Sequence, residues 1–145
     1  MIRPIIHSPN KILSTPSSAV DNFSVSSIKN LIEDLKDTVV SENGVGIAAP
    51  QIGQSLRVIV INYQKEPYAI INPEITWRAN GTSFLEEGCL SVPDIFVKVE
   101  RPKKVTVTGI DEKGNVIEMK AKDMLAKVLQ HEIDHIDGIL ISNYL

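Results

Sequence analysis

An α+β fold is expected, with antiparallel or mixed β-strands around a central helix that carries a His-Glu-x-x-His pattern and with an amphipathic helix near the N-terminus. Apolar residues recur at helical spacing near both ends of the chain, whereas short β-branched runs occupy the middle. At 145 residues and 43% hydrophobic content, we expect one globular domain, residues 1–145.

The first part of the chain predicts irregular structure followed by a helix. Residues 8–27 are rich in Ser, Pro, Thr and Asn, which is typical of irregular surface chain. An amphipathic helix follows, and Asn43-Gly44 is a plausible stop for it. Its apolar face would comprise Ile28, Leu31, Ile32, Leu35 and Val39.

The middle of the chain predicts strands. Residues 56–61 form an apolar β-branched run that is typical of a buried strand. Residues 68–72 and 75–79 predict two further strands, broken by Pro73. Residues 103–110 alternate in polarity, and a second expected strand, residues 115–120, follows across a Gly-containing loop. This pattern predicts a hairpin.

A second helix is expected from about Asp123 to Asp137, with Asp123 as a cap at its start and Gly138 at its end. It contains His131 and His135, which lie one turn apart on one face and can converge on one metal ion. Glu132 would stand beside that metal, where it can take a proton from bound water. The alternative is a polar helix face with two hydrogen-bonded His side chains.

A catalytic metal site of this kind needs three protein ligands and one open position. None of the ten residues after His135 is His, Glu or Cys, so the third ligand is expected upstream. The single Cys, Cys89, would supply a thiolate that suits Zn²⁺ and Fe²⁺. Its alternative role is that of a small buried hydrophobe. His7 is a second candidate ligand.

The segment from Gly44 to Gln51 is a loop of small residues. It has the spacing of a dinucleotide-binding turn, but it follows a helix and leads to a strand, which is the reverse of that motif. Such a loop can bind an extended substrate through its backbone, with Gln51 as a neutral donor. The alternative is a turn that simply requires small residues.

Composition excludes several classes of function. The formal charge is −3 and both signs are mixed along the chain, so no direct reading of nucleic acid is expected. No stretch approaches the roughly 18 apolar residues of a membrane span. One Cys cannot form an internal disulfide, and we expect a reducing, cytoplasmic location.

Three segments together resemble the peptide deformylase family: Gly-Val-Gly-Ile-Ala-Ala-Pro-Gln, Glu-Gly-Cys-Leu-Ser and Gln-His-Glu-Ile-Asp-His. They occur in the family's order and with similar spacing, and Pro9, Leu13 and Arg101 also fit. The resemblance spans roughly residues 4–140. It implies removal of the N-formyl group from the initiator formyl-methionine of nascent polypeptides, with release of formate.

The resemblance also implies roles for individual residues. Glu132 would deprotonate the metal-bound water, which is the nucleophile, and later protonate the leaving amine. Gln51 and the backbone N–H of Leu90 would stabilise the oxyanion, while the backbone at Val45 and Gly46 would pair with the substrate. The metal, most often Fe²⁺ with Zn²⁺, Ni²⁺ or Co²⁺ as substitutes, would be held by Cys89, His131 and His135.

The methionine side chain of such a substrate needs an apolar pocket. By motif position its candidate lining residues are Val45, Leu85, Met124 and Val128, each of which is also a candidate for plain core. Further candidates for substrate binding are Glu87, Gly88 and Arg101.

The chain departs from the common family pattern near its end. It stops ten residues after His135, and Ser142-Asn143 replaces the usual Asp-Arg. Such short forms resemble those of some bacteriophages, so a bacterial, phage or organelle origin stays open. The family segment implicated in docking to the ribosome would be absent from such a short form, so the ribosome exit region is the less expected partner. We expect a monomer.

Three other functions remain open at this point. A metalloprotease would use the same water-activating helix and would cleave internal peptide bonds. A non-catalytic domain would bind peptides or keep a structural metal, although a structural zinc site needs four ligands. A thiol hydrolase would pair Cys89 with a His as its nucleophile and base.

Overall fold

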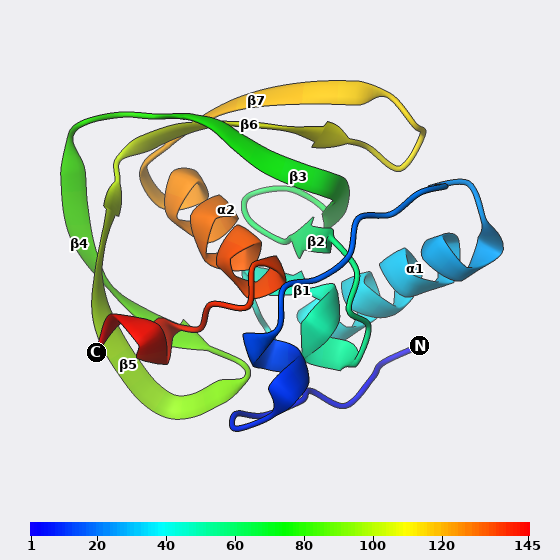
Figure 1. Cartoon of the computed structure of the whole chain (residues 1–145), viewed down its shortest axis with the longest axis horizontal. Coiled ribbons are helices and arrows are strands. Elements are labelled where there is room, and N and C mark those ends of the chain that lie inside the picture. The colour runs from blue at the N-terminus through cyan, green and yellow to red at the C-terminus, as the bar shows by residue number, and fades with distance from the viewer.

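The computed structural model describes residues 1–145, and it combines two helices with two antiparallel sheets (Figure 1). The helices are α1 (Ser26–Ser41) and α2 (Asp123–Ile136). The larger sheet has the order β1 (Gly46–Ala48), β2 (Val58–Ile61), β3 (Tyr68–Arg78), β6 (Lys104–Ile110) and β7 (Val116–Lys122). The smaller sheet pairs β4 (Thr82–Cys89) with β5 (Val92–Pro102). Short 3-10 helices are η1 (Lys11–Ser14), η2 (Ala49–Ile52) and η3 (Ile141–Tyr144).

Helices cover both faces of the larger sheet at β2. Val58 and Val60 pack into the apolar cluster of α1, whereas Ile59 and Ile61 pack into that of α2. Because successive strand side chains point to opposite faces, a strand covered on both sides must be apolar throughout. Within the run at residues 56–61, the strand begins at Val58, and all four β2 side chains are fully buried because both faces are covered.

The expected break at Pro73 is wrong. Residues 68–78 form one continuous strand, β3, and its register against β6 shifts between Ile71 and Glu74. Proline has no N–H to donate to a ladder, and such an irregularity accommodates it without ending the strand. The expected hairpin is found as β6 and β7.

The expected cap at the start of α2 is also wrong. Lys122 occupies the cap position, and no side chain caps the helix. The Asp123 N–H instead donates to the Lys103 carbonyl at 3.1 Å, so it continues the strand pairing of β6 and β7. At the other end Gly138 adopts a φ of 78°, and its N–H donates to the His135 carbonyl. Glycine suits this left-handed conformation.

Residues 8–27 contribute more than irregular surface chain. Leu13 of η1 is fully buried and joins a third apolar cluster with Val99 of β5 and Ile141 of η3. Strands β4 and β5 were not anticipated from the sequence at all. They extend along the side of α2, and the C-terminal η3 lies against β5 (Figure 1). Neither helix has the length and apolar character needed to cross a membrane.

Candidate active site

A cavity of about 460 Å³ lies between the start of β1, the β4–β5 sheet and α2. Most residues singled out in the sequence line it, whereas His135 and Arg101 lie behind its wall, 1% and 4% exposed. The lining residues from the predicted set are Val45, Gly46, Gln51, Leu85, Glu87, Gly88, Cys89, Leu90, Met124, Val128, His131 and Glu132.

Three candidate metal ligands converge at one end of this cavity. Nε2 of His135 lies 3.2 Å from Sγ of Cys89 and 3.2 Å from Nε2 of His131. In a tetrahedral site with ordinary Zn–S and Zn–N bond lengths, such donor atoms lie about 3.3 to 3.6 Å apart. The donor set therefore fits one divalent ion. His7 is exposed and does not belong to this cluster.

Local structure explains the convergence. His131 and His135 follow each other by one turn of α2, so their rings share a face. Cys89 ends β4, where the pairing with β5 shifts register after Glu87. Gly88 lies directly against Phe96 of β5. A Cβ at this position would come within 2.9 Å of the phenyl ring, so the close packing requires glycine.

Glu132 is a buried acid of the site with an unpaired carboxylate oxygen. Its side chain is 3% exposed, and its Oε1 has no hydrogen-bond partner. Burial raises its pKa to about 7, because a charged carboxylate loses solvation there. A carboxyl group with a pKa near neutrality can accept a proton in one step and return it in another.

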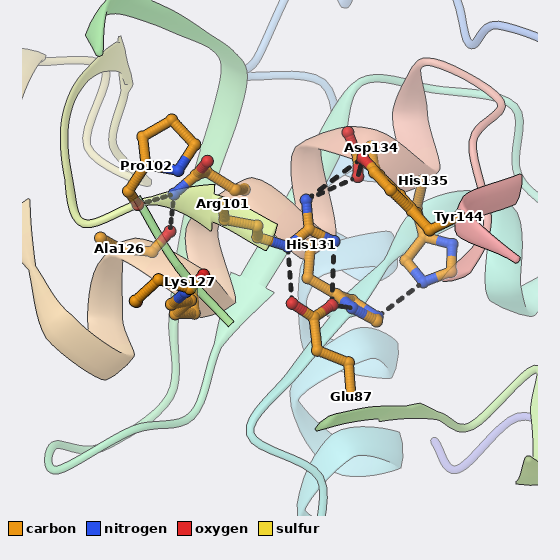
Figure 2. A network of polar contacts seen from close by, with 11 residues as sticks. Glu87, Arg101, Pro102, Ala126, Lys127, His131, Asp134, His135 and Tyr144 are labelled. Atoms are coloured by element: carbon orange, nitrogen blue, oxygen red, sulfur yellow. Dashed lines mark hydrogen bonds and ion pairs between the residues drawn. The ribbon is translucent and has the colours of Figure 1, made fainter. Parts of the chain in front are cut away.

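A buried network of charges orients His131 (Figure 2). Glu87 accepts hydrogen bonds from Arg101 Nε at 2.6 Å, from Arg101 Nη2 at 2.8 Å and from His131 Nδ1 at 2.9 Å. Arg101 Nη1 donates to Asp134 at 2.8 Å, and the Tyr144 hydroxyl donates to Asp134 at 2.6 Å. This network holds Nδ1 of His131 and leaves Nε2 for a metal.

The electrostatics favour a positive charge at the ligand cluster. Burial raises the pKa of Glu87, but its bonds with Arg101 and His131 outweigh burial and lower it to about 2. Burial lowers the pKa of His131, yet its contacts with Cys89 and Glu87 raise it to about 10. Burial also keeps the pKa of His135 low. A bound cation would take the place of the proton that the site otherwise favours.

Gln51 and Leu90 flank the cluster on the cavity side. Gln51 is 1% exposed, and its Nε2 faces Cys89 Sγ at 3.8 Å. Leu90 lies in the turn after Cys89, and its backbone N–H has no hydrogen-bond partner within the chain. Both groups are neutral donors beside the place where the three ligands meet. They can stabilise negative charge that develops on a substrate oxygen.

Strand β1 borders the cavity at the edge of the larger sheet, with β2 on its other side. Such an edge can pair with an extended peptide. Gly46 of β1 also lies against Glu132, since a Cβ there would come within 2.7 Å of its Oε2. The absence of a side chain at Gly46 therefore lets the carboxylate approach the strand.

Sequence reasoning missed Asp134, Tyr144 and the buried pairing of Arg101. The position of Asp134 between the two His residues of one helix was the available signal. Arg101 was predicted to bind substrate, whereas its guanidinium is occupied by Glu87 and Asp134 and does not line the cavity.

Known proteins are similar to this chain in sequence and in fold. A family model described as polypeptide deformylase matches residues 2–145. A peptide deformylase of Bartonella henselae is 41% identical over 149 aligned residues, covering 99% of this chain and 84% of that protein.

Solved structures agree with this match. A peptide deformylase from Legionella pneumophila, 43% identical, superposes with a TM-score of 0.94 over 100% of this chain and 86% of that one. A Met-Ala-Ser-bound class I type b peptide deformylase from Acinetobacter baumannii is 31% identical. It superposes with a TM-score of 0.94 over 100% of this chain and 99% of that one. By sequence and by structure, the chain belongs to the polypeptide deformylase family.

Proposed function

We propose that this chain hydrolyses the N-formyl group of the initiator formyl-methionine on nascent polypeptides and releases formate. The observation that carries the proposal is the convergence of Cys89, His131 and His135 beside Glu132, whose buried Oε1 has no partner. A purely structural metal site would need a fourth ligand and no free carboxylate. Membership of the deformylase family supports the same reaction.

We propose Fe²⁺ as the ion held by Cys89, His131 and His135, with Zn²⁺, Ni²⁺ or Co²⁺ able to replace it. When bound, the ion acts as a Lewis acid and brings the pKa of water toward about 7. Glu132 accepts the proton of the attacking water and later gives it to the leaving amine. Gln51 Nε2 and the Leu90 N–H donate to the developing oxyanion, at about 3 kcal/mol for such a donor.

The lining of the cavity supports a methionine-bearing substrate. Leu85, Met124 and Val128 line it with Val45, and they offer apolar contact to the methionine side chain. The edge of β1 would pair with the peptide backbone. The tripeptide named for the Acinetobacter baumannii structure, Met-Ala-Ser, is what deformylation of formyl-Met-Ala-Ser would leave.

Formate release from formyl-Met-Ala-Ser tests the proposal, with protein loaded anaerobically with Fe²⁺. We expect rapid release that a chelator abolishes and added metal restores, since the three ligands serve one ion. Activity that survives complete metal removal would favour Cys89 as a nucleophile instead. Cleavage of internal peptide bonds would identify a metalloprotease. A folded, metal-loaded protein that releases no formate would overturn the proposal.

Replacement of Gly46 by alanine is expected to lower kcat for formate release by about 100-fold. The new Cβ would overlap Glu132 Oε2 and Cγ, so the carboxylate must move by a few tenths of an ångström or more. Misplacement of a reacting group by about 1 Å can cost about 100-fold in rate.

Gly81→Ala is the matched control for Gly46→Ala, because a Cβ at Gly81 meets nothing closer than Lys103 Cδ at 3.9 Å. Steady-state kinetics and metal analysis of both variants make the comparison. Unchanged kcat in Gly46→Ala would contradict the role assigned to the Glu132 position.

A further inference from the structure

The side-chain amide of Gln51 is held at both of its ends. Its Oε1 accepts the Ala48 N–H at 2.9 Å, and its Nε2 donates to Ser91 Oγ at 3.1 Å. The Ala48 N–H can only donate, so the oxygen of the amide must face it. The Nε2 end is thereby directed toward Ser91 and the cavity.

The geometry leaves one hydrogen of Gln51 for a substrate. Nε2 carries two hydrogens, and the bond to Ser91 Oγ uses one of them. The other points toward Cys89 Sγ at 3.8 Å, which is a long and weak contact. A formyl oxygen at the metal cluster would accept this second hydrogen in preference to the sulfur.

Ser91 is itself fixed in place. Its side chain is fully buried, and its carbonyl accepts the Ser8 N–H at 2.8 Å. The carbonyl of Gln51 likewise accepts the Ile6 N–H at 2.8 Å. One N-terminal segment therefore ties η2 to the turn after β4. The Gln51–Ser91 bond joins these two elements at the cavity.

We propose that Ser91 is a positioning residue that orients the Gln51 amide so that one Nε2 hydrogen faces the formyl oxygen. This inference rests on the proposed function, in which Gln51 is an oxyanion donor. Ser91 does not touch the substrate. Its hydroxyl oxygen accepts one Nε2 hydrogen of Gln51, which keeps the amide from rotating and leaves the other Nε2 hydrogen facing the formyl oxygen.

Ser91→Ala tests the inference in the metal-loaded protein. We expect kcat to fall about tenfold, because the hydrogen bond that orients Gln51 for the transition state is lost. KM and metal content should stay unchanged. Ser17→Ala is the matched control, because Ser17 is 8% exposed and its Oγ is buried without a partner. We expect wild-type kcat from that variant. A wild-type kcat in Ser91→Ala would overturn the inference.

A double-mutant cycle separates positioning from general packing. Gln51→Ala is expected to lower kcat by about 100-fold, as for other oxyanion donors. Adding Ser91→Ala to that variant should cost nothing further, because the group that Ser91 orients is gone. If the fold-loss in kcat of the double variant equals the product of the two single fold-losses, the inference is overturned. Wild-type kcat in Gln51→Ala would overturn it together with the role of Gln51, whereas failure of the proposed function appears as wild-type protein that releases no formate.

A readout without turnover is the side-chain amide signal of Gln51 in the NMR spectrum of the zinc-loaded protein. In Ser91→Ala we expect its proton shifts to change and its hydrogen exchange to accelerate, because the Nε2 hydrogen has lost its acceptor. Ser17→Ala should leave the signal unchanged. An undisturbed Gln51 signal in Ser91→Ala would count against the inference.

Discussion

Replacing Glu132 by glutamine is expected to lower kcat for formate release by about 1,000-fold, within the range typical of a lost general base. Glutamine keeps the shape of the side chain but cannot accept the proton of the attacking water. Because Glu132 Oε1 has no partner in the protein, the substitution breaks no internal bond of that oxygen. Steady-state kinetics at matched metal content measure the effect. The metal-free variant should unfold at the same temperature as the wild type or higher, since a buried charge is removed.

The control for this variant is Glu86→Gln. Glu86 lines the same cavity, but its side chain is exposed and it belongs to neither the ligand cluster nor the charge network. We expect its kcat to lie within about twofold of the wild type, as for a solvated surface charge. A Glu132→Gln variant that keeps a tenth of wild-type kcat would exclude Glu132 as the essential base.

Local patterns were enough to predict the parts of the site that lie on one element. His131 and His135 converge because a helix turns every 3.6 residues, and the same rule puts Glu132 beside them. The run at residues 56–61 predicted a buried strand because burial on two faces requires apolar side chains throughout. Such features depend on neighbours that are close in the sequence.

The remainder depends on packing between distant segments. Glu87, Arg101, Asp134 and Tyr144 come from β4, β5, α2 and η3, and no sequence spacing shows that their side chains meet. Arg101 was therefore expected at the substrate. Strands β4 and β5 escaped prediction because they expose large apolar residues such as Phe84 and Phe96, so their alternation of polarity is weak.

Arg101→Met is expected to lower the free energy of unfolding of the metal-free protein by about 3 to 5 kcal/mol, the usual cost of breaking a buried ion pair. Arg101 is 4% exposed and Glu87 is 6% exposed, so the variant leaves a buried carboxylate with His131 as its one remaining partner in this network. Metal affinity should also fall about 10- to 100-fold, because Glu87 would lose the two Arg101 bonds that fix its position against His131. Urea unfolding at pH 7 and chelator competition measure the two effects.

Arg57→Met provides the comparison that separates a buried charge pair from an exposed one. Arg57 pairs with Asp137 at 2.9 Å, but their side chains are 23% and 44% exposed, so we expect a cost of about 1 kcal/mol or less. Combining Arg101→Met with Glu87→Gln should recover part of the lost stability, because the unpaired charge is then removed as well. If Arg101→Met costs no more than Arg57→Met, the network does not stabilise the fold. If Arg101→Met keeps the wild-type metal affinity, Arg101 does not help Glu87 to orient His131.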